Sequence, residues 1–310
     1  MVYINLIKKE KERIEMTKKN PWFTDKYFII TGGSSGIGLA LSKEFLLNGA
    51  RVIIVSYDPN EFEAARTELE TLPDIEEKIE FYKCDITKAE DRMALKEELL
   101  KRNFDIAGLV NNAGITTYGP FFETPSKDIE RLMQINFVGS IMFTKDLFPL
   151  CLTQECLEEG QLKYIVFMSS TSGIVPFPFI GGYSGTKRGV EFFLESLSHE
   201  LPKNVKILRM RPGTVYTNLY KNALQADCAD INDLLQTTEN MKVNITADKV
   251  AKPLVKAIIK KKSGRMYPNL TTRLFYGMLA MPFLGKRMMK YATKKMESGF
   301  EKKSDIKSEI

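Results

Sequence analysis

A glycine-rich turn at residues 31–38, with the sequence Thr-Gly-Gly-Ser-Ser-Gly-Ile-Gly, constrains this chain more than any other stretch. It follows the apolar run 27–30 and precedes a helix-forming run over 39–47. Backbone N–H groups at a helix N-terminus face outward, and the helix dipole favours negative charge there. Glycine allows the positive φ and the close backbone approach that a phosphate needs. The turn therefore predicts an anion site, although glycine-rich turns also occur for purely structural reasons.

Strand and helix patterns alternate from residue 26 onward. Apolar, β-branched and aromatic runs predict strands at 26–31, 51–56, 78–83, 106–110, 163–169, 204–210 and 265–267. Helices are predicted over 36–48, 61–71, 88–102, 127–153, 183–200 and 246–261. Nearly continuous apolar strands are typical of parallel strands covered on both faces. We therefore predict an α/β fold, a single doubly wound parallel β-sheet with helices on both faces, whose ligands bind at the carboxyl ends of the strands.

Charge is distributed unevenly along the chain, whose net charge is +6. Residues 1–20 hold six Lys/Arg and three Glu, residues 252–310 hold fifteen Lys/Arg and four Asp/Glu, and residues 21–251 therefore carry −8. We divide the chain into a charged N-terminal extension (1–24), the α/β domain (25–268) and a basic, partly apolar C-terminal segment (269–310). An acidic body without a basic stripe argues against nucleic-acid binding. The basic ends suit an anionic membrane surface or are solvated tails.

The cysteines and the single histidine argue against a metal site. Cys84, Cys151, Cys156 and Cys228 show no metal-ligand spacing, and His199 falls near the end of a predicted helix. We expect free thiols, which are typical of a reducing compartment. The apolar patch 2–7 is too short for a secretory signal. The expected location is the cytoplasm or a membrane surface that faces it.

Tyr183 and Lys187 stand four residues apart in a predicted helix, so they share one helix face. A phenol beside an ammonium group is expected to have a lowered pKa, because the cation favours the phenolate. Such a tyrosine can exchange a proton near neutral pH. Ser170 ends an apolar strand thirteen residues before Tyr183, and Asn111 follows another strand. A surface Tyr–Lys pair is the alternative.

These motifs together resemble the short-chain dehydrogenase/reductase family over about residues 25–267. The resemblance includes the TGxxxGIG turn, the segment 111–114 (Asn-Asn-Ala-Gly), Asn136, Ser170, the YxxxK pair and the run 211–217, in the family's order. It implies a Rossmann-type domain and nicotinamide-dependent oxidation or reduction of an alcohol/carbonyl pair.

The resemblance also implies roles for the site residues. Tyr183 would be the proton donor, and Lys187 would lower its pKa and bind the nicotinamide ribose. Ser170, rather than its neighbour Ser169, would bind the substrate oxygen. Asn136 would hold a water molecule that relays protons to Lys187, and this role rests on the resemblance alone.

The implied cofactor site is larger. Around the pyrophosphate and adenosine it would use Gly32, Ser34, Ser35, Gly36, Ile37 and Gly38. Asp85 would bind the adenine amine, Asn111 and Ala113 the adenosine side, and Val215 and Thr217 the carboxamide. NAD users of the family place Asp at the end of the second strand, where this chain has Ser56. The missing carboxylate favours NADP(H), whereas Asp58 would argue for NAD(H) if the loop curled back.

Aromatic residues point to a lipophilic substrate. Phe177, Phe179 and Ile180, with Phe121, Phe122 and Tyr216, predict an apolar pocket, and ordinary packing is the alternative. Residues 32–41 and 131–137 look similar to 3-ketodihydrosphingosine reductases, but the turn 211–213 departs from that subgroup. A hydroxysteroid dehydrogenase-like enzyme is the sibling alternative. A non-catalytic cofactor-binding or scaffold protein is disfavoured, because such relatives usually lose the Tyr or the Lys.

The uncharged run 274–285 is too short to span a bilayer, which needs about twenty residues. Cations flank it, so residues 270–296 suit peripheral contact with a membrane, and a lid or a subunit interface is the alternative. The family resemblance implies a homo-dimer or tetramer that forms through the helices at 127–153 and 183–200. Phe192, Phe193 and Leu197 would supply the contact.

Overall fold

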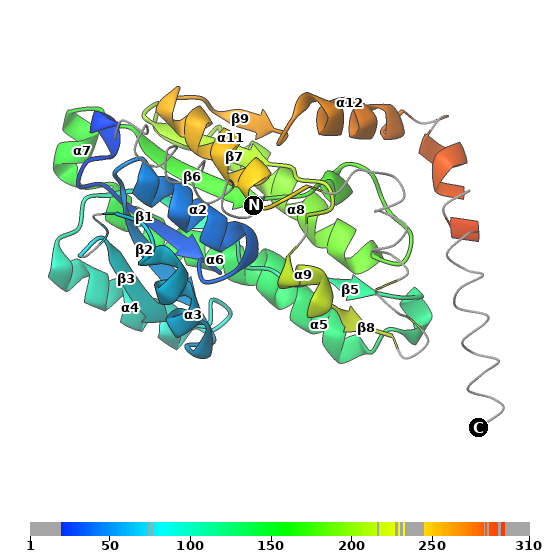
Figure 1. The fold of residues 1–310 in the computed structure, drawn as a ribbon. Coiled ribbons are helices and arrows are strands. Elements are labelled where there is room, and N and C mark those ends of the chain that lie inside the picture. Colours follow the sequence, from blue (N-terminus) through cyan, green and yellow to red (C-terminus); the bar gives the residue numbers. More distant parts are fainter. Residues whose placement is uncertain are drawn as a thin grey trace, which may run out of the picture.

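The central sheet has seven parallel strands in the order β3-β2-β1-β4-β6-β7-β9 (Figure 1). The strands are β1 (Tyr27–Thr31), β2 (Arg51–Ser56), β3 (Ile79–Lys83), β4 (Ile106–Asn111), β6 (Lys163–Met168), β7 (Val205–Met210) and β9 (Gly264–Met266). This computed structural model describes residues 20–294, apart from 74, 76, 216, 227–228, 230–231, 233–244, 282, 284 and 291–292. The strand order reverses between β1 and β4, and ligands bind at such a point in open α/β sheets.

Helices cover both faces of the sheet, as predicted (Figure 1). One face carries α2 (Gly36–Leu47), α3 (Asn60–Leu69) and α11 (Asp248–Ile259), whose apolar side chains pack with Phe28 and Ile54. The other face carries α4 (Ala89–Arg102), α6 (Ser140–Leu147) and α8 (Gly181–Leu197), which pack with Ile29 and Ile53. Neighbouring strand residues face opposite sides of a sheet, so a continuous apolar strand fills both cores.

The helix predicted over 127–153 is divided into four parts. They are α5 (Ser126–Met133), a π-helical turn (η3, Gln134–Gly139), α6 and a 3-10 turn (η4, Phe148–Cys151). Pro149 lies inside the last turn, where a proline cannot donate a helical hydrogen bond. The π-helical turn has no comparable signal in the sequence.

Several short elements lie outside the central sheet. They are β5 (Thr117–Tyr118) and β8 (Leu224–Gln225), which pair in parallel, the helices α7 (Gln154–Glu158), α9 (Asn218–Lys221) and α12 (Leu270–Leu279), and the 3-10 turns η2 (Phe121–Glu123) and η5 (Thr171–Gly173). Runs of two to five residues carry little periodicity, which is why the sequence pattern does not predict most of them.

Both predicted end segments have parts that pack on the body. In η1 (Pro21–Phe23), Phe23 is fully buried beside Phe28 and Phe45. At the other end, Tyr276 and Leu279 of α12 are buried against Val175. Most of the predicted N-terminal extension, as well as Tyr216 and Cys228, lies outside the described residues.

Candidate active site

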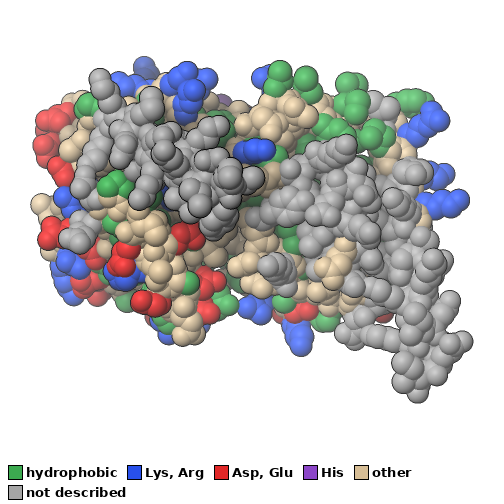
Figure 2. Space-filling view, in the orientation of Figure 1, with side chains coloured by type: hydrophobic (Ala, Val, Ile, Leu, Met, Phe, Trp, Pro, Cys, Tyr) green, Lys and Arg blue, Asp and Glu red, His purple; other side chains and the backbone are tan. Residues whose placement is uncertain are grey.

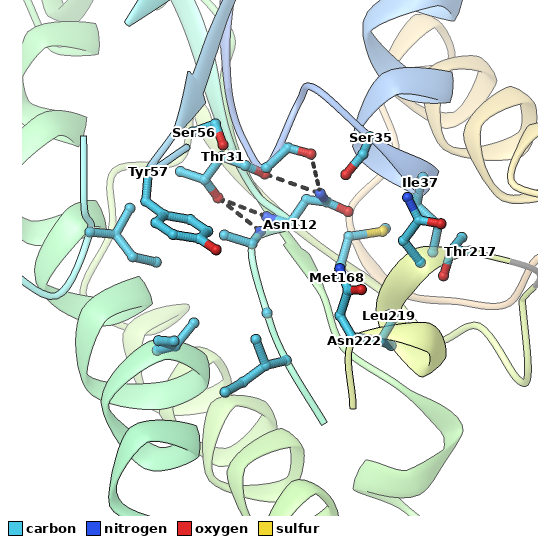
Figure 3. Close-up of a pocket in the computed structure, with 18 of the residues that line it drawn as sticks. Thr31, Ser35, Ile37, Ser56, Tyr57, Asn112, Met168, Thr217, Leu219 and Asn222 are labelled. Carbon is cyan, nitrogen blue, oxygen red and sulfur yellow. Dashed lines mark hydrogen bonds between the residues drawn. The ribbon is translucent and has the colours of Figure 1, made fainter. Parts of the chain in front are cut away.

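A cleft of about 710 Å³ opens at the carboxyl ends of the strands. Its walls come from the β1–α2 turn, the ends of β2, β3, β4 and β6, the start of α8, and the segment 212–224. Figure 3 shows Thr31, Ser56 and Asn112 on one side of this cleft and Thr217, Leu219 and Asn222 on the other. The cleft therefore lies at the switch point of the sheet, as the fold predicts.

The segment after β4 holds the glycine-rich turn in place. Asn112 Nδ2 donates to the carbonyl oxygens of Thr31 and Gly32, each at 3.1 Å (Figure 3). Thr31 Oγ1 accepts from the backbone N–H groups of Asn112 and Ala113, at 3.0 and 3.1 Å. Gly32 has φ +61°, and a Cβ there would stand 3.1 Å from Asn112 Nδ2. Glycine is required at this position by conformation and by space.

The N-terminus of α2 faces the cleft and is suited to an anion. Ser35 is the N-cap residue, but its side chain makes no capping hydrogen bond. The N–H groups of the first helical turn lack intrahelical partners, and they can bind a phosphate. Thr217 lies across the turn, because a Cβ on Gly36 would stand 3.2 Å from its Cβ. These residues fit the pyrophosphate of a nicotinamide dinucleotide.

Three residues predicted to bind the cofactor lie behind the wall of the cleft. The hydroxyl of the buried Ser34 donates to Glu61. A Cβ on Gly38 would stand 1.9 Å from the carbonyl oxygen of Gly32, so this glycine allows α2 to pack under the turn. Asn111 Nδ2 donates to Thr144 Oγ1 of α6 at 2.9 Å. These three residues support the site from behind and do not line the cleft.

The remaining predicted cofactor residues line the cleft: Gly32, Ser35, Gly36, Ile37, Ser56, Asp85, Ala113, Tyr183, Lys187, Val215 and Thr217. Asp85 is held after β3, where its Oδ1 accepts from the N–H and the hydroxyl of Thr87, at 3.0 and 2.7 Å. Asn112 also lines the cleft, whereas its neighbour Asn111 was the residue predicted to bind the adenosine side. Because strand residues alternate in direction, only one of these two asparagines can face the turn.

Ser170, Tyr183 and Lys187 come together on the cleft wall. Tyr183 and Lys187 lie on one face of α8, and Ser170 caps η5, where its Oγ accepts from Ser172 N at 3.1 Å. Lys187 Nζ donates to the carbonyl oxygen of Met168 at 2.9 Å and lies 5.6 Å from the Tyr183 ring centroid. The predicted grouping of three side chains from two separate elements is present.

The pKa of Tyr183 differs from the expectation. Burial raises the pKa of the Tyr183 phenol to about 12, and its hydrogen bond with Ser170 offsets only part of this effect. Burial also lowers the pKa of the Lys187 ammonium, to about 8. The prediction of a lowered tyrosine pKa was wrong, because desolvation of the phenolate raises the pKa by more than the hydrogen bond with Ser170 lowers it. Tyr183 is therefore protonated at neutral pH.

Asn136 lies in the π-helical turn and makes three contacts. Its Oδ1 accepts from Ile115 N and its Nδ2 donates to Ile115 O, both at 2.8 Å. Nδ2 also lies 3.4 Å from Thr186 Oγ1, one residue before Lys187. The side chain thus ties the segment after β4 to α8. π-Helical turns are frequent at functional sites.

A carboxylate lies beside Ser56, but it is not Asp58. Glu61 of α3 lines the cleft, and Ser34 Oγ and Ser56 Oγ donate to its Oε2, the latter at 3.4 Å. Asp58 Oδ1 instead accepts from Asn60 N at 3.0 Å at the start of α3. Glu61 is not among the predicted site residues, because it follows the end of β2 by five residues.

Apolar side chains surround Tyr183 on the substrate side. Tyr118, Leu132 and Ile180 form a cluster with Tyr183, and Phe177 and Phe179 pack against it. None of Phe177, Phe179 and Ile180 lines the cleft, so these three residues pack behind Tyr183, which was the alternative to a pocket lining. In contrast, the side chains of Phe121 and Phe122 are 66% and 93% exposed, so the prediction that they line the pocket was wrong. Their 3-10 turn places both rings at the surface.

The short chain dehydrogenase family model matches residues 26–228. The chain belongs to this family. It is therefore a dehydrogenase/reductase, which confirms the class of oxidoreductase that the motifs predicted.

Curated relatives from this family cover most of the chain. A dehydrogenase/reductase SDR family protein 7-like from Anopheles gambiae is 29% identical over 81% of this chain and 77% of its own. The NADPH-dependent 3-dehydrocapnine reductase of Ornithobacterium rhinotracheale is 26% identical over 85% of this chain and 94% of its own. Among solved structures, a short-chain dehydrogenase/reductase from Burkholderia phymatum in complex with NAD has a TM-score of 0.69 and 20% identity, covering 83% and 93% of the two chains. This last similarity supports the fold.

In this family member, a buried ion pair lies one helical turn beyond Lys187. Glu191 of α8 accepts from Arg211 Nε at 2.8 Å and from Arg211 NH2 at 2.6 Å, so the pair is bidentate. Both side chains are buried. Burial raises the pKa of the Glu191 carboxyl, but hydrogen bonds from Arg211 and Ser169 and the charges of Arg211 and Arg209 together lower it below its ordinary value. The pair fixes the helix that carries Tyr183 to the segment after β7.

Proposed function

We propose that this chain interconverts a ketone and a secondary alcohol with NAD(P)(H), and that Tyr183 is the acid/base. The arrangement of Ser170, Tyr183 and Lys187 on the wall of one cleft carries the proposal. A nicotinamide cofactor, when bound, supplies or accepts the hydride. Its pyrophosphate would be held at the N-terminus of α2 and its nicotinamide half by Lys187, Val215 and Thr217.

The side chains of the chain handle the oxygen and the proton. Ser170 would donate a hydrogen bond to the substrate oxygen and hold it next to Tyr183. Tyr183, protonated at neutral pH, would give its proton to that oxygen in the reduction direction. Lys187 would place a positive charge near the phenol and stabilise the developing phenolate. Asn136 would act indirectly, because it holds the backbone of Ile115 and the side chain of Thr186.

The substrate that we propose is lipophilic. The apolar cluster around Tyr183 and the packing of α12 support this class of substrate. Tyr276 of α12 lies against Gly213 on the cleft wall, since a Cβ on Gly213 would stand 2.9 Å from the Tyr276 hydroxyl. The C-terminal helix thus packs against the wall of the cleft at Gly213.

The proposed function is tested by following the oxidation of NADH and NADPH with a panel of ketosphingoid, steroid, retinoid and fatty-acyl carbonyl compounds. Turnover of a lipophilic ketone that exceeds turnover of its short water-soluble analogue supports the proposal. Dinucleotide binding without turnover on any carbonyl would favour a non-catalytic cofactor-binding protein instead.

We also propose that the segment after β9 contacts a membrane surface that faces the cytoplasm. Leu270 and Leu274 are 65% and 63% exposed on the outer face of α12, and Met281 and Phe283 continue the exposed apolar surface. Figure 2 shows hydrophobic side chains gathered over the position of α12, with Lys and Arg side chains beside them. Among the described residues, no helix combines the length and apolar character needed to cross a bilayer. An in-plane contact fits both observations.

We expect the full chain to co-sediment with vesicles of phosphatidylcholine and phosphatidylserine, and less so at high salt. Leu270→Ser/Leu274→Ser should lower the vesicle-bound fraction about tenfold, because serine has less apolar surface than leucine to bury in the lipid. The control is Leu100→Ser, which changes an exposed leucine on α4. Equal sedimentation of the double variant and the wild type would exclude α12 as the contact.

A homo-dimer or tetramer through α6 and α8 is our proposal for the assembly. Phe192 of α8 is exposed, and the Arg188 guanidinium lies 4.5 Å from its ring centroid. Phe193 and Leu197 pack partly on the chain's own core, so Phe192 is the stronger candidate for the contact.

Phe192→Ser is expected to raise the dissociation constant of the assembly about tenfold in sedimentation velocity, as is usual for an aromatic contact residue. Phe122→Ser is the control, and a wild type that stays monomeric at all concentrations would contradict the proposal.

A further inference from the structure

Glu61 brings a carboxylate into the part of the cleft where the adenosine ribose of a dinucleotide would bind. It lies in the first turn of α3, directly after the β2–α3 connection, and it lines the cleft together with Ser56 and Tyr57. The family rule places the residue that binds the ribose 2′-hydroxyl at the end of this second strand. In this chain the strand itself ends on a serine, and the acidic group comes from the following helix.

Two buried serines hold the Glu61 carboxylate. Ser34, in the β1–α2 turn, and Ser56, at the end of β2, both donate to Oε2. Ser56 Oγ also accepts from Asp58 N at 3.3 Å, which fixes the direction in which its proton points. The hydroxyl groups that could have bound a 2′-phosphate are therefore used by a carboxylate.

The positively charged side chains that line the cleft do not lie on the same segments as Glu61. Within the part of the chain that the structure describes, they are Lys127 and Arg131 on α5 and Lys187 on α8. The lining residues of the β1–α2 turn and the β2–α3 connection include the Glu61 carboxylate and no Lys or Arg. A 2′-phosphate placed there would meet a like charge.

We propose that Glu61 selects for NAD(H) and against NADP(H). The carboxylate accepts a hydrogen bond from the ribose 2′-hydroxyl of NAD(H), and it repels the 2′-phosphate of NADP(H). This replaces the preference for NADP(H) that the sequence alone predicts, because that preference depends on the absence of a carboxylate beside Ser56. The inference rests on the proposed function, since it assumes that a dinucleotide occupies the cleft.

The test is calorimetric titration of the full-length wild type, Glu61→Gln and Glu63→Gln with NADH and NADPH. Glu63 is the matched control, because it is an exposed glutamate in the same first turn of α3. The wild type should bind NADH at least about tenfold more tightly than NADPH, and Glu61→Gln should reduce or remove this difference, chiefly through tighter NADPH binding. Glu63→Gln should keep the wild-type ratio. Glu61→Ala serves as a second variant, in which the ratio should change in the same direction.

The proposal is overturned if the wild type binds NADPH as tightly as NADH, or if Glu61→Gln changes both affinities equally. In those cases two dinucleotides still bind, so the proposed function stands. If the wild type binds neither dinucleotide, the proposed function and the role of Glu61 fail together.

Discussion

Tyr183→Phe is expected to lower turnover of a carbonyl substrate at least about a hundredfold, which is the usual scale of general acid catalysis. The substitution removes the hydroxyl that bonds Ser170 and keeps the ring, which packs with Leu132 and Ile180. Dinucleotide affinity should therefore remain within a few-fold of the wild type. Steady-state kinetics and a binding titration on the same preparation measure both quantities.

Tyr118→Phe is the matched control for this experiment. Tyr118 belongs to the same apolar cluster but does not line the cleft, so the same chemical change should leave turnover within a few-fold of the wild type. Near-normal turnover of Tyr183→Phe would exclude this residue as the acid.

The pH dependence of the wild type gives a second test. The rate of carbonyl reduction should be flat up to about pH 8 and fall above it, because Lys187 loses its charge there while Tyr183 stays protonated.

Glu191→Ala is expected to destabilise the fold by roughly 3–5 kcal/mol, because it leaves the buried Arg211 without its carboxylate partner. For a domain of this size, such a loss corresponds to a melting temperature lower by roughly 6–20 °C. Glu191 shares a face of α8 with Tyr183 and Lys187, so turnover of the folded fraction should also fall. Thermal unfolding and kinetics on the same sample measure the two effects.

Two further variants show whether the buried pair itself is responsible. Glu200→Ala removes an exposed glutamate just beyond α8 and should change stability by at most about 0.5 kcal/mol. The double variant Glu191→Leu/Arg211→Met removes both charges and should recover most of the stability that Glu191→Ala loses. If the double variant is as unstable as Glu191→Ala, the loss of stability comes from packing around position 191 and not from the unpaired charge.

The sheet could be predicted from the sequence because its strands are buried on both faces. The predicted strands agree with β1, β2, β3, β4, β6, β7 and β9 to within one or two residues. The grouping of Ser170, Tyr183 and Lys187 was also predictable, since parallel strands bring their carboxyl ends to one edge. The remaining elements of the site depend on contacts that have no local pattern, such as the pairing of β5 with β8.

Three features of the site required three-dimensional information. The pKa of Tyr183 is raised because the phenol is buried, and burial is not visible in the spacing of Tyr183 and Lys187. Glu61 reaches the cleft because α3 starts directly beside the end of β2, which the sequence does not indicate. The choice between Asn111 and Asn112 depends on where β4 ends and which side chain faces the turn. The predicted strand ended one residue too early, and Asn112, the first residue after β4, faces the turn.

The π-helical turn at Gln134–Gly139 makes this chain sensitive to the length of that helix, not only to its composition. Each residue added to or removed from an α-helix rotates everything after it by about 100°. A π-helical turn absorbs one extra residue locally, so deleting one residue from it would restore a regular helix and keep Phe143 and Leu147 of α6 in the core in which both are fully buried. Asn136 lies within the turn, and it would lose its position against Ile115 and Thr186. A single-residue deletion within the turn would therefore harm the active site and leave the core in register, whereas the same deletion inside α6 would rotate the rest of that helix out of the core.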